Sequence, residues 1–132
     1  MQIIVKAKVF SGEGNGKRYI NLPWVKKQIK EKMGFRPYLG TLNLTISPDT
    51  KITNLMSKAK GSKIIPEKGF SSGVLHKVLV KGETYGAIVR PEVSGYPENV
   101  LEIVAPISLR EKYGLKDGDE VELKIWLKAM CP

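Results

Sequence analysis

The stretch that decides the fold is LKDGDEVELKI, residues 115–125. Its Asp117-Gly118-Asp119 segment is a turn sequence, because these residue types favour sharp reversals of the backbone. Residues 120–127 then alternate polar and apolar side chains, as a strand with one buried face does. Tight turns that lead into a strand in this way recur in several small β-barrels, so this segment predicts architecture rather than chemistry.

Further short strands precede this stretch. Alternation predicts strands at residues 2–10 and 41–46, and residues 74–81, 84–90 and 100–104 are predicted strands as well. Two of them, 74–81 and 84–90, form a predicted hairpin across the turn at residues 81–83. Together with residues 120–127 this gives six strands that are not separated regularly by helices. That pattern favours a small barrel over a doubly wound sheet.

Helical spacing is clear in one place only. Asn21 as N-cap and an early Pro23 predict a helix that ends at Gly34. A second, short helix is predicted from Ser108 to Tyr113, closed by Gly114. The intervening segments 35–40 and 91–99 are predicted loops. For residues 47–72 we predict loop with a short helical turn that Asp49 caps. The fold class is therefore mainly β, with one clear helix and one short helix.

Composition bounds the function. A chain of 132 residues suits one domain, and a net charge of +9 favours polyanionic or phosphorylated ligands. No apolar run approaches the roughly 20 residues that span a bilayer. The alternating N-terminus predicts a strand rather than a signal peptide. Cys131, the single cysteine, allows no internal disulfide. We therefore expect a cytoplasmic protein with no membrane partner.

Residues 11–18, SGEGNGKR, form a predicted glycine-rich loop. Alternating glycines let successive backbone N–H groups converge on an anion, and Lys17 and Arg18 add positive charge. The pattern is not a P-loop, because Ser11 stands at the first glycine position, and Lys17 replaces the third glycine of the dinucleotide-binding fingerprint. The loop suits a di- or triphosphate; a flexible hairpin loop is the alternative.

The segment GFRPYLGTLNL, residues 34–44, is the most distinctive of the chain. Thr41 and Asn43 lie two apart on a predicted strand, so their side chains share one face. Hydroxyl and carboxamide oxygens are hard ligands that could hold Mg²⁺ together with phosphate oxygens. The alternative is a half-exposed strand with polar side chains facing outward.

Three further residues are candidates for chemistry. Glu102 lies on a strand beside the loop that contains Ser94, where its carboxylate could accept a proton from a substrate hydroxyl. Arg110, at the start of the short helix, could bind a phosphate or base edge through paired hydrogen bonds. A surface glutamate and a structural ion pair are the alternatives. His76, Trp24 and Trp126 are assigned structural positions.

In their order along the chain, four segments resemble the archaeal-type CTP-dependent riboflavin kinase family: SGEGNGKRY, GFRPYLGTLNL, KGETYGAIVRP and LEIVAPISLREKYGLKDGDEVEL. The resemblance covers nearly the whole chain and is weakest across residues 47–72. It implies a single riboflavin kinase domain over residues 1–132, built as a six-stranded cradle-loop barrel. It also implies transfer of the terminal phosphate of CTP to the ribityl 5′-hydroxyl of riboflavin, which gives FMN and CDP.

The resemblance also implies roles for individual residues. Those expected to line the nucleotide are Glu13, Gly14, Asn15, Gly16, Lys17, Arg18, Ile107, Ser108, Leu109 and Arg110. Thr41 and Asn43 would hold Mg²⁺, Ser94 and Glu102 would face the flavin, and Glu102 would also act in catalysis. We expect a monomer whose partners are riboflavin and CTP, with no nucleic acid.

Two alternatives remain at this point. Swapped-hairpin transcription factors share the turn of residues 115–125, and the net charge of +9 suits DNA. Such a regulator would not need the glycine loop together with Thr41 and Asn43. The second alternative is a flavin or nucleotide sensor that keeps the barrel without turnover.

Overall fold

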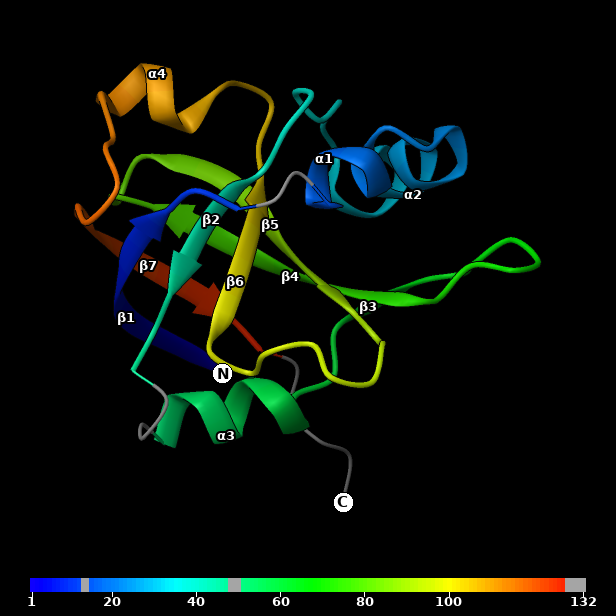
Figure 1. Ribbon diagram of the computed structural model, residues 1–132, viewed down its shortest axis with the longest axis horizontal. Coiled ribbons are helices and arrows are strands. Elements are labelled where there is room, and N and C mark those ends of the chain that lie inside the picture. The colour runs from blue at the N-terminus through cyan, green and yellow to red at the C-terminus, as the bar shows by residue number, and fades with distance from the viewer. Residues whose placement is uncertain (13–14, 48–50, 128–132) are drawn as a thin grey trace.

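The computed structural model describes residues 1–12, 15–47 and 51–127 (Figure 1). Its strands and helices follow one another in the order β1(Gln2–Phe10), α1(Asn15–Ile20), α2(Pro23–Met33), β2(Leu42–Thr45), α3(Lys51–Lys58), β3(Ser62–Ile64), β4(Gly73–Val80), β5(Thr84–Pro91), β6(Val100–Val104), α4(Leu109–Tyr113) and β7(Glu120–Trp126). All strand pairs are antiparallel. The predicted strands and the mainly β fold class are confirmed.

The barrel closes at β4, whose first half pairs with β3 and whose second half pairs with β7. The strands lie in the order β3-β4-β5-β6-β2-β1-β7, and β4 also pairs with β7. Along the edge that faces away from β5, β4 pairs with β3 through residues 73–75 and with β7 through residues 78–80. Six strands therefore form the closed barrel that the sequence predicts, and β3 extends one edge of it.

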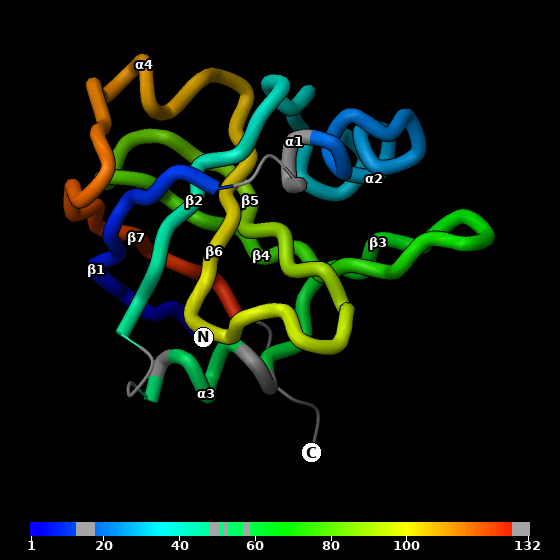
Figure 2. Tube along the Cα trace, in the orientation of Figure 1, coloured from blue at the N-terminus to red at the C-terminus, as the bar shows by residue number. Residues whose placement is uncertain are grey.

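Two hydrophobic cores follow from the alternation of the strands. The interior of the barrel holds one core, to which α3 contributes Met56 and α4 contributes Leu109. Because α3 and α4 lie at opposite ends of the barrel, these side chains help to close its two openings (Figure 2). Val25 and Ile29 of α2 cover a second core on the outer face, against Val89 and neighbouring strand residues.

The helical regions differ from the prediction in two places. Residues 11–18 were expected to be loop throughout, but α1 begins at Asn15. Its Ile20 is buried in the second core, and this tertiary contact stabilises a helix that local sequence does not favour. The N-cap of α2 is Leu22, with extended backbone, rather than Asn21. Pro23 and the left-handed Gly34 occupy their predicted places.

Residues 47–72 contain more regular structure than expected, because α3 and β3 both fall there. Asp49, the predicted cap, lies outside the described residues. His76 is buried, in agreement with a structural position. Trp24 packs against the second core, and Trp126 is half-buried beside Tyr85. In the described part of the chain, no helix combines the length and apolar character that crossing a membrane requires.

Candidate functional site

The site begins where β2 lies between β1 and β6. Asn43 of β2 is the cross-strand partner of Glu102 on one side and of Phe10 on the other. Leu42 and Leu44 point into the barrel, so Thr41 and Asn43 face outward, and both are half-buried. Directly paired side chains of antiparallel strands approach closely on one face of the sheet. The pairing of β2 with β6 thus places the Glu102 side chain next to that of Asn43.

Gly12 lies against the Asn43 side chain. A Cβ atom built on Gly12 would come within 2.6 Å of Nδ2 and 2.9 Å of Cγ of Asn43. Any side chain at position 12 would therefore displace the carboxamide. The first glycine of the predicted phosphate loop is thus required by close approach, a role that sequence reasoning did not assign to it.

The rest of the glycine loop is only partly placed. Glu13 and Gly14 lie outside the described residues, and the side chains of residues 15–17 are likewise not described. The backbone of Asn15, Gly16 and Lys17 forms the first turn of α1, and Arg18 is exposed on the same helix. The structure therefore locates the start of the loop, at Gly12, beside Asn43.

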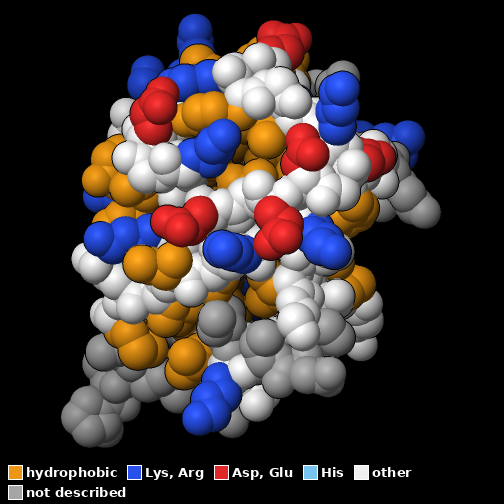
Figure 3. Space-filling view, turned by 90° about the vertical axis from the view of Figure 1, so that its left-hand side faces the viewer, with side chains coloured by type: hydrophobic (Ala, Val, Ile, Leu, Met, Phe, Trp, Pro, Cys, Tyr) orange, Lys and Arg blue, Asp and Glu red, His pale blue; other side chains and the backbone are white. Residues whose placement is uncertain are grey.

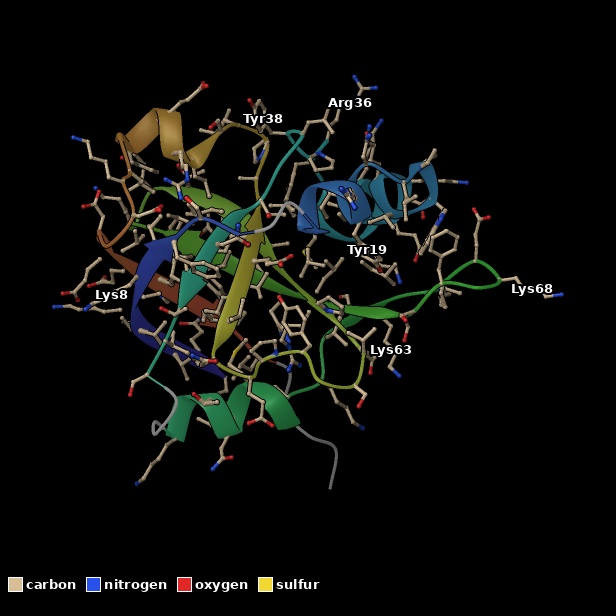
Figure 4. All side chains as sticks on the ribbon, in the orientation of Figure 1. Lys8, Tyr19, Arg36, Tyr38, Lys63 and Lys68 are labelled. Atoms are coloured by element: carbon tan, nitrogen blue, oxygen red, sulfur yellow. The ribbon has the colours of Figure 1, made fainter. Side chains whose placement is uncertain are left out.

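A small pocket brings Thr41 together with the predicted nucleotide segment. It has a volume of about 80 Å³ and is lined by Tyr38, Gly40, Thr41, Leu42, Ile103, Ala105, Ile107, Ser108, Leu109 and Arg110. The backbone N–H of Tyr38 donates to the Ala105 carbonyl at 2.8 Å and joins the two sides of the pocket. Figure 4 shows Tyr38, in the segment of residues 35–41, beside the connection from β6 to α4.

Arg110 anchors this pocket to the start of the glycine loop. Its guanidinium donates to the Phe10 carbonyl at 3.1 Å, to the Leu115 carbonyl at 3.3 Å and to Asp117 Oδ1 at 2.8 Å. The Ser11 hydroxyl donates to the same carboxylate. Arg110, followed by Ser11, holds the pKa of Asp117 below its usual value. The structural ion pair that the sequence left open is thus formed, and Arg110 also lines the pocket.

Ser108 has a local role as well. Its backbone is extended, and its hydroxyl accepts a hydrogen bond from the Glu111 N–H at 3.3 Å, so it is the N-cap of α4. Gly114, in the left-handed conformation, ends the helix as predicted. This cap fixes the segment 107–110 against Thr41.

Burial is the main influence on Glu102. Loss of solvent raises the pKa of its carboxyl, and the nearby Tyr96 hydroxyl partly offsets this by lowering that pKa. Tyr96 lies in the loop of residues 92–99, and its hydroxyl oxygen is buried. Ser94 is exposed in the same loop, and no hydrogen bond of the described residues involves it. The structure therefore places Tyr96 of this loop close to Glu102, and the sequence carried no signal for this contact.

The described residues contain no group of three or more His, Cys, Asp or Glu side chains arranged to hold a metal ion. Thr41 and Asn43 instead offer two neutral oxygens on one face, next to the Glu102 carboxylate. Mg²⁺ commonly takes one or two protein oxygens and fills its coordination with phosphate and water. This donor set fits such an ion.

Known proteins resemble this chain over the segments that form the site. A family model named CTP-dep_RFKase, with the description "Domain of unknown function DUF120", matches residues 9–125. The chain belongs to the archaeal-type CTP-dependent riboflavin kinase family. The match begins at Val9, near the end of β1, and ends at Ile125 in β7, so it includes every helix and strand between these two.

Relatives of this riboflavin kinase family chain come from several archaea. Proteins named riboflavin kinase from Pyrobaculum islandicum and Archaeoglobus fulgidus are 37% and 39% identical to it, over 97% and 95% of this chain. The chain spans only 63% and 55% of the length of those two relatives. A riboflavin kinase from Sulfurisphaera tokodaii is 38% identical over 93% of this chain and 95% of its own length.

Proposed function

We propose that this chain is a CTP-dependent riboflavin kinase that transfers the terminal phosphate of CTP to the ribityl 5′-hydroxyl of riboflavin. The observation that carries the proposal is the direct pairing of Asn43 with Glu102, with Gly12 packed against Asn43. Three segments far apart in the sequence thus supply a phosphate loop, hard oxygen ligands and a carboxylate at one place. The relatives named riboflavin kinase support the kinase part of the proposal, and the name of the family model supports CTP as the donor.

The nucleotide is assigned to two segments of the chain. The glycine loop, residues 13–18, holds the phosphates, and residues 107–110 hold the cytidine side of the pocket beside Thr41. Thr41 and Asn43 are assigned to Mg²⁺, which when bound neutralises charge on the transferred phosphoryl group. The flavin lies on the Glu102 side, toward the loop that carries Ser94.

Glu102 supplies the proton chemistry. Its carboxylate takes the proton of the ribityl 5′-hydroxyl as the hydroxyl oxygen forms a bond to the terminal phosphorus of CTP. The bond from that phosphorus to the bridging oxygen breaks, and CDP leaves with the electron pair. A carboxyl whose pKa is raised by burial is a stronger base than an exposed one, which suits this role.

The DNA-binding alternative gains little from the surface. On the face formed by β1 and β7, Lys6 pairs across the strands with Glu122, and Lys8 with Glu120. Figure 3 shows acidic and basic side chains interspersed over this side of the molecule. A duplex favours a surface of one sign, so this face is a poor match for DNA.

The test is to incubate the purified protein with riboflavin, Mg²⁺ and each of CTP, ATP, GTP and UTP in turn, and to separate the flavins by chromatography. We expect FMN with CTP and little with ATP. Equal FMN with every nucleotide would retain the kinase and remove the cytidine assignment of residues 107–110. Glu102→Gln should abolish most of the turnover, while Glu67→Gln, at an exposed glutamate between β3 and β4, should not.

Failure has two distinguishable forms. No FMN with any donor, while riboflavin or CDP still raises the melting temperature, would indicate a sensor. No turnover and no shift, with DNA binding that weakens steeply as salt rises, would indicate a regulator.

A further inference from the structure

Strands β5 and β6 diverge next to Glu102. Their last cross-strand pair is Val89 with Glu102. Beyond it, β5 continues beside β4 as far as Pro91, whereas β6 stays paired with β2 as far as Val100. The loop of residues 92–99 connects the two strands across this fork. Glu102 therefore lies at the point where the outer sheet surface opens.

Tyr96 is the side chain that this loop turns inward. Residues 92–95, 97 and 98 are exposed, whereas Tyr96 is half-buried and its hydroxyl oxygen is buried. Gly95 has a φ of 86°, and the Tyr96 N–H donates to the Val93 carbonyl at 3.3 Å, which closes a tight turn. With Arg90 and Val100, Tyr96 lines a cavity of about 110 Å³ in the fork.

The Tyr96 hydroxyl lies between two charged groups and makes no hydrogen bond of normal geometry to any described residue. Burial raises its pKa, the Glu102 carboxylate raises it further, and Arg90 lowers it. Arg90 is itself fixed, because it donates to His76 Nε2 at 3.1 Å and to the Ala59 carbonyl at 3.3 Å. The neutral Asn43 faces Glu102 from β2.

We propose that Tyr96 is a positioning residue whose hydroxyl orients the Glu102 carboxylate toward the ribityl hydroxyl. A buried hydroxyl without a partner costs free energy, and a small rotation toward Glu102 would satisfy it once substrate orders the carboxylate. The fork fixes the tyrosine ring, so the hydroxyl approaches Glu102 from the side of the loop, opposite Asn43. This inference rests on the proposed kinase function, in which Glu102 receives the proton.

The competing explanation is that Tyr96 only fills the fork. Tyr96→Phe separates the two roles, because it keeps the ring and removes the hydroxyl alone. The matched control is Tyr85→Phe, at an exposed tyrosine of β5 whose ring contacts Trp126. Thermal unfolding of both variants reports whether the fold is retained.

The experiment is a double-mutant cycle on FMN formation with CTP. Tyr96→Phe should lower kcat by about tenfold or more, since small displacements of a reacting group are costly, and leave the KM for CTP unchanged. In the Glu102→Gln background the same substitution should produce no further loss, because it acts through the carboxylate. Tyr85→Phe should have no effect in either background.

Two results would overturn the inference. Tyr96→Phe could match the wild type, or it could lose the same factor in both backgrounds, which would mean that it acts independently of Glu102. Both results require a wild type that makes FMN, so they differ from failure of the proposed function, in which the wild type makes none and the inference falls with it.

Discussion

Two polar clusters of this molecule differ in what their side chains bind. Near the end of β5, Arg90 donates hydrogen bonds to Nε2 of the buried His76 and to the Ala59 carbonyl. At the β2–β6 junction, Asn43 and Glu102 are half-buried neighbours, and no side-chain hydrogen bond between described residues uses the Asn43 amide. In the first cluster Arg90 and Nε2 of His76 bond to groups inside the fold, although Nδ1 of His76 is buried without a partner among the described residues. The second keeps oxygens at the surface, as a ligand site must.

The sharpest test of this difference is Asn43→Ala. If the amide serves a ligand rather than the fold, turnover to FMN should fall by about 10²–10³-fold, a range typical for loss of one electrostatic group in an active site. The melting temperature should change little. The measurement is FMN formation at limiting and saturating Mg²⁺, with Asn21→Ala, at an exposed asparagine, as the control. Unchanged turnover at limiting Mg²⁺ would remove Asn43 from the metal site.

The buried cluster should respond to pH through stability rather than turnover. Burial, followed by Arg90, lowers the pKa of His76 from 6.5 to about 4. Between those values the unfolded chain binds a proton that the folded protein does not. Acidification from pH 6.5 to about 4 should therefore remove about 3 kcal/mol of stability, and the loss should level off below.

Urea unfolding across this pH range measures the effect, with His76→Gln as reference. Carboxylates contribute equally to both proteins, so the difference between them isolates the histidine. A wild type and variant with the same dependence on pH would show that His76 is not the group responsible.

A smaller effect is expected from Gly12→Ala. The new methyl group would push the Asn43 amide aside, so FMN formation should fall by about tenfold, as for a group displaced rather than removed. In the Asn43→Ala background, where the contact is absent, Gly12→Ala should cost much less. Equal losses in both backgrounds would point to an effect on the loop backbone instead.

The smallest effect should come from Asp117→Asn. Asp117 ties Arg110 to Ser11, but it is exposed, and exposed ion pairs contribute little. We expect the KM for CTP to rise by less than about tenfold, with kcat unchanged and the difference shrinking at high salt. Asp119→Asn, in the same turn, is the comparison. A lowered kcat would mean that the ion pair positions the reacting groups directly.

The sequence predicted the strands well because alternation is a local property. Residues 100–104 and the hairpin across 81–83 lie where expected, since one buried face is enough to fix them. Helix α1 could not be predicted from local sequence, because it is stabilised by the burial of Ile20 in a core that distant strands assemble. Helix α3 was not predicted for the same reason, because its Met56 is buried in the barrel interior.

The sequence predicted which residues form the site, but not how their side chains contact one another. Thr41 and Asn43 were singled out by their spacing, and Glu102 by its place beside a loop. The direct pairing of Asn43 with Glu102 is set by the register of β2 against β6. This register cannot be predicted from the local sequence of either strand. The contact of Gly12 with Asn43 and the inward turn of Tyr96 likewise follow only from the folded strands.

The seam between β1 and β7 also has a consequence for biosynthesis. Residues 2–8 pair with residues 120–126, and Val9 exchanges backbone hydrogen bonds with Gly118 and Asp119. Contacts between such distant parts of a chain form late, because the entropy of closing the loop must be overcome first. On the ribosome, β1 can pair with β2 early, but its seam with β7 can form only after β7 has emerged. Until then the barrel stays open between β1 and β4, and we expect the nascent chain to lack the closed fold that carries the proposed donor site.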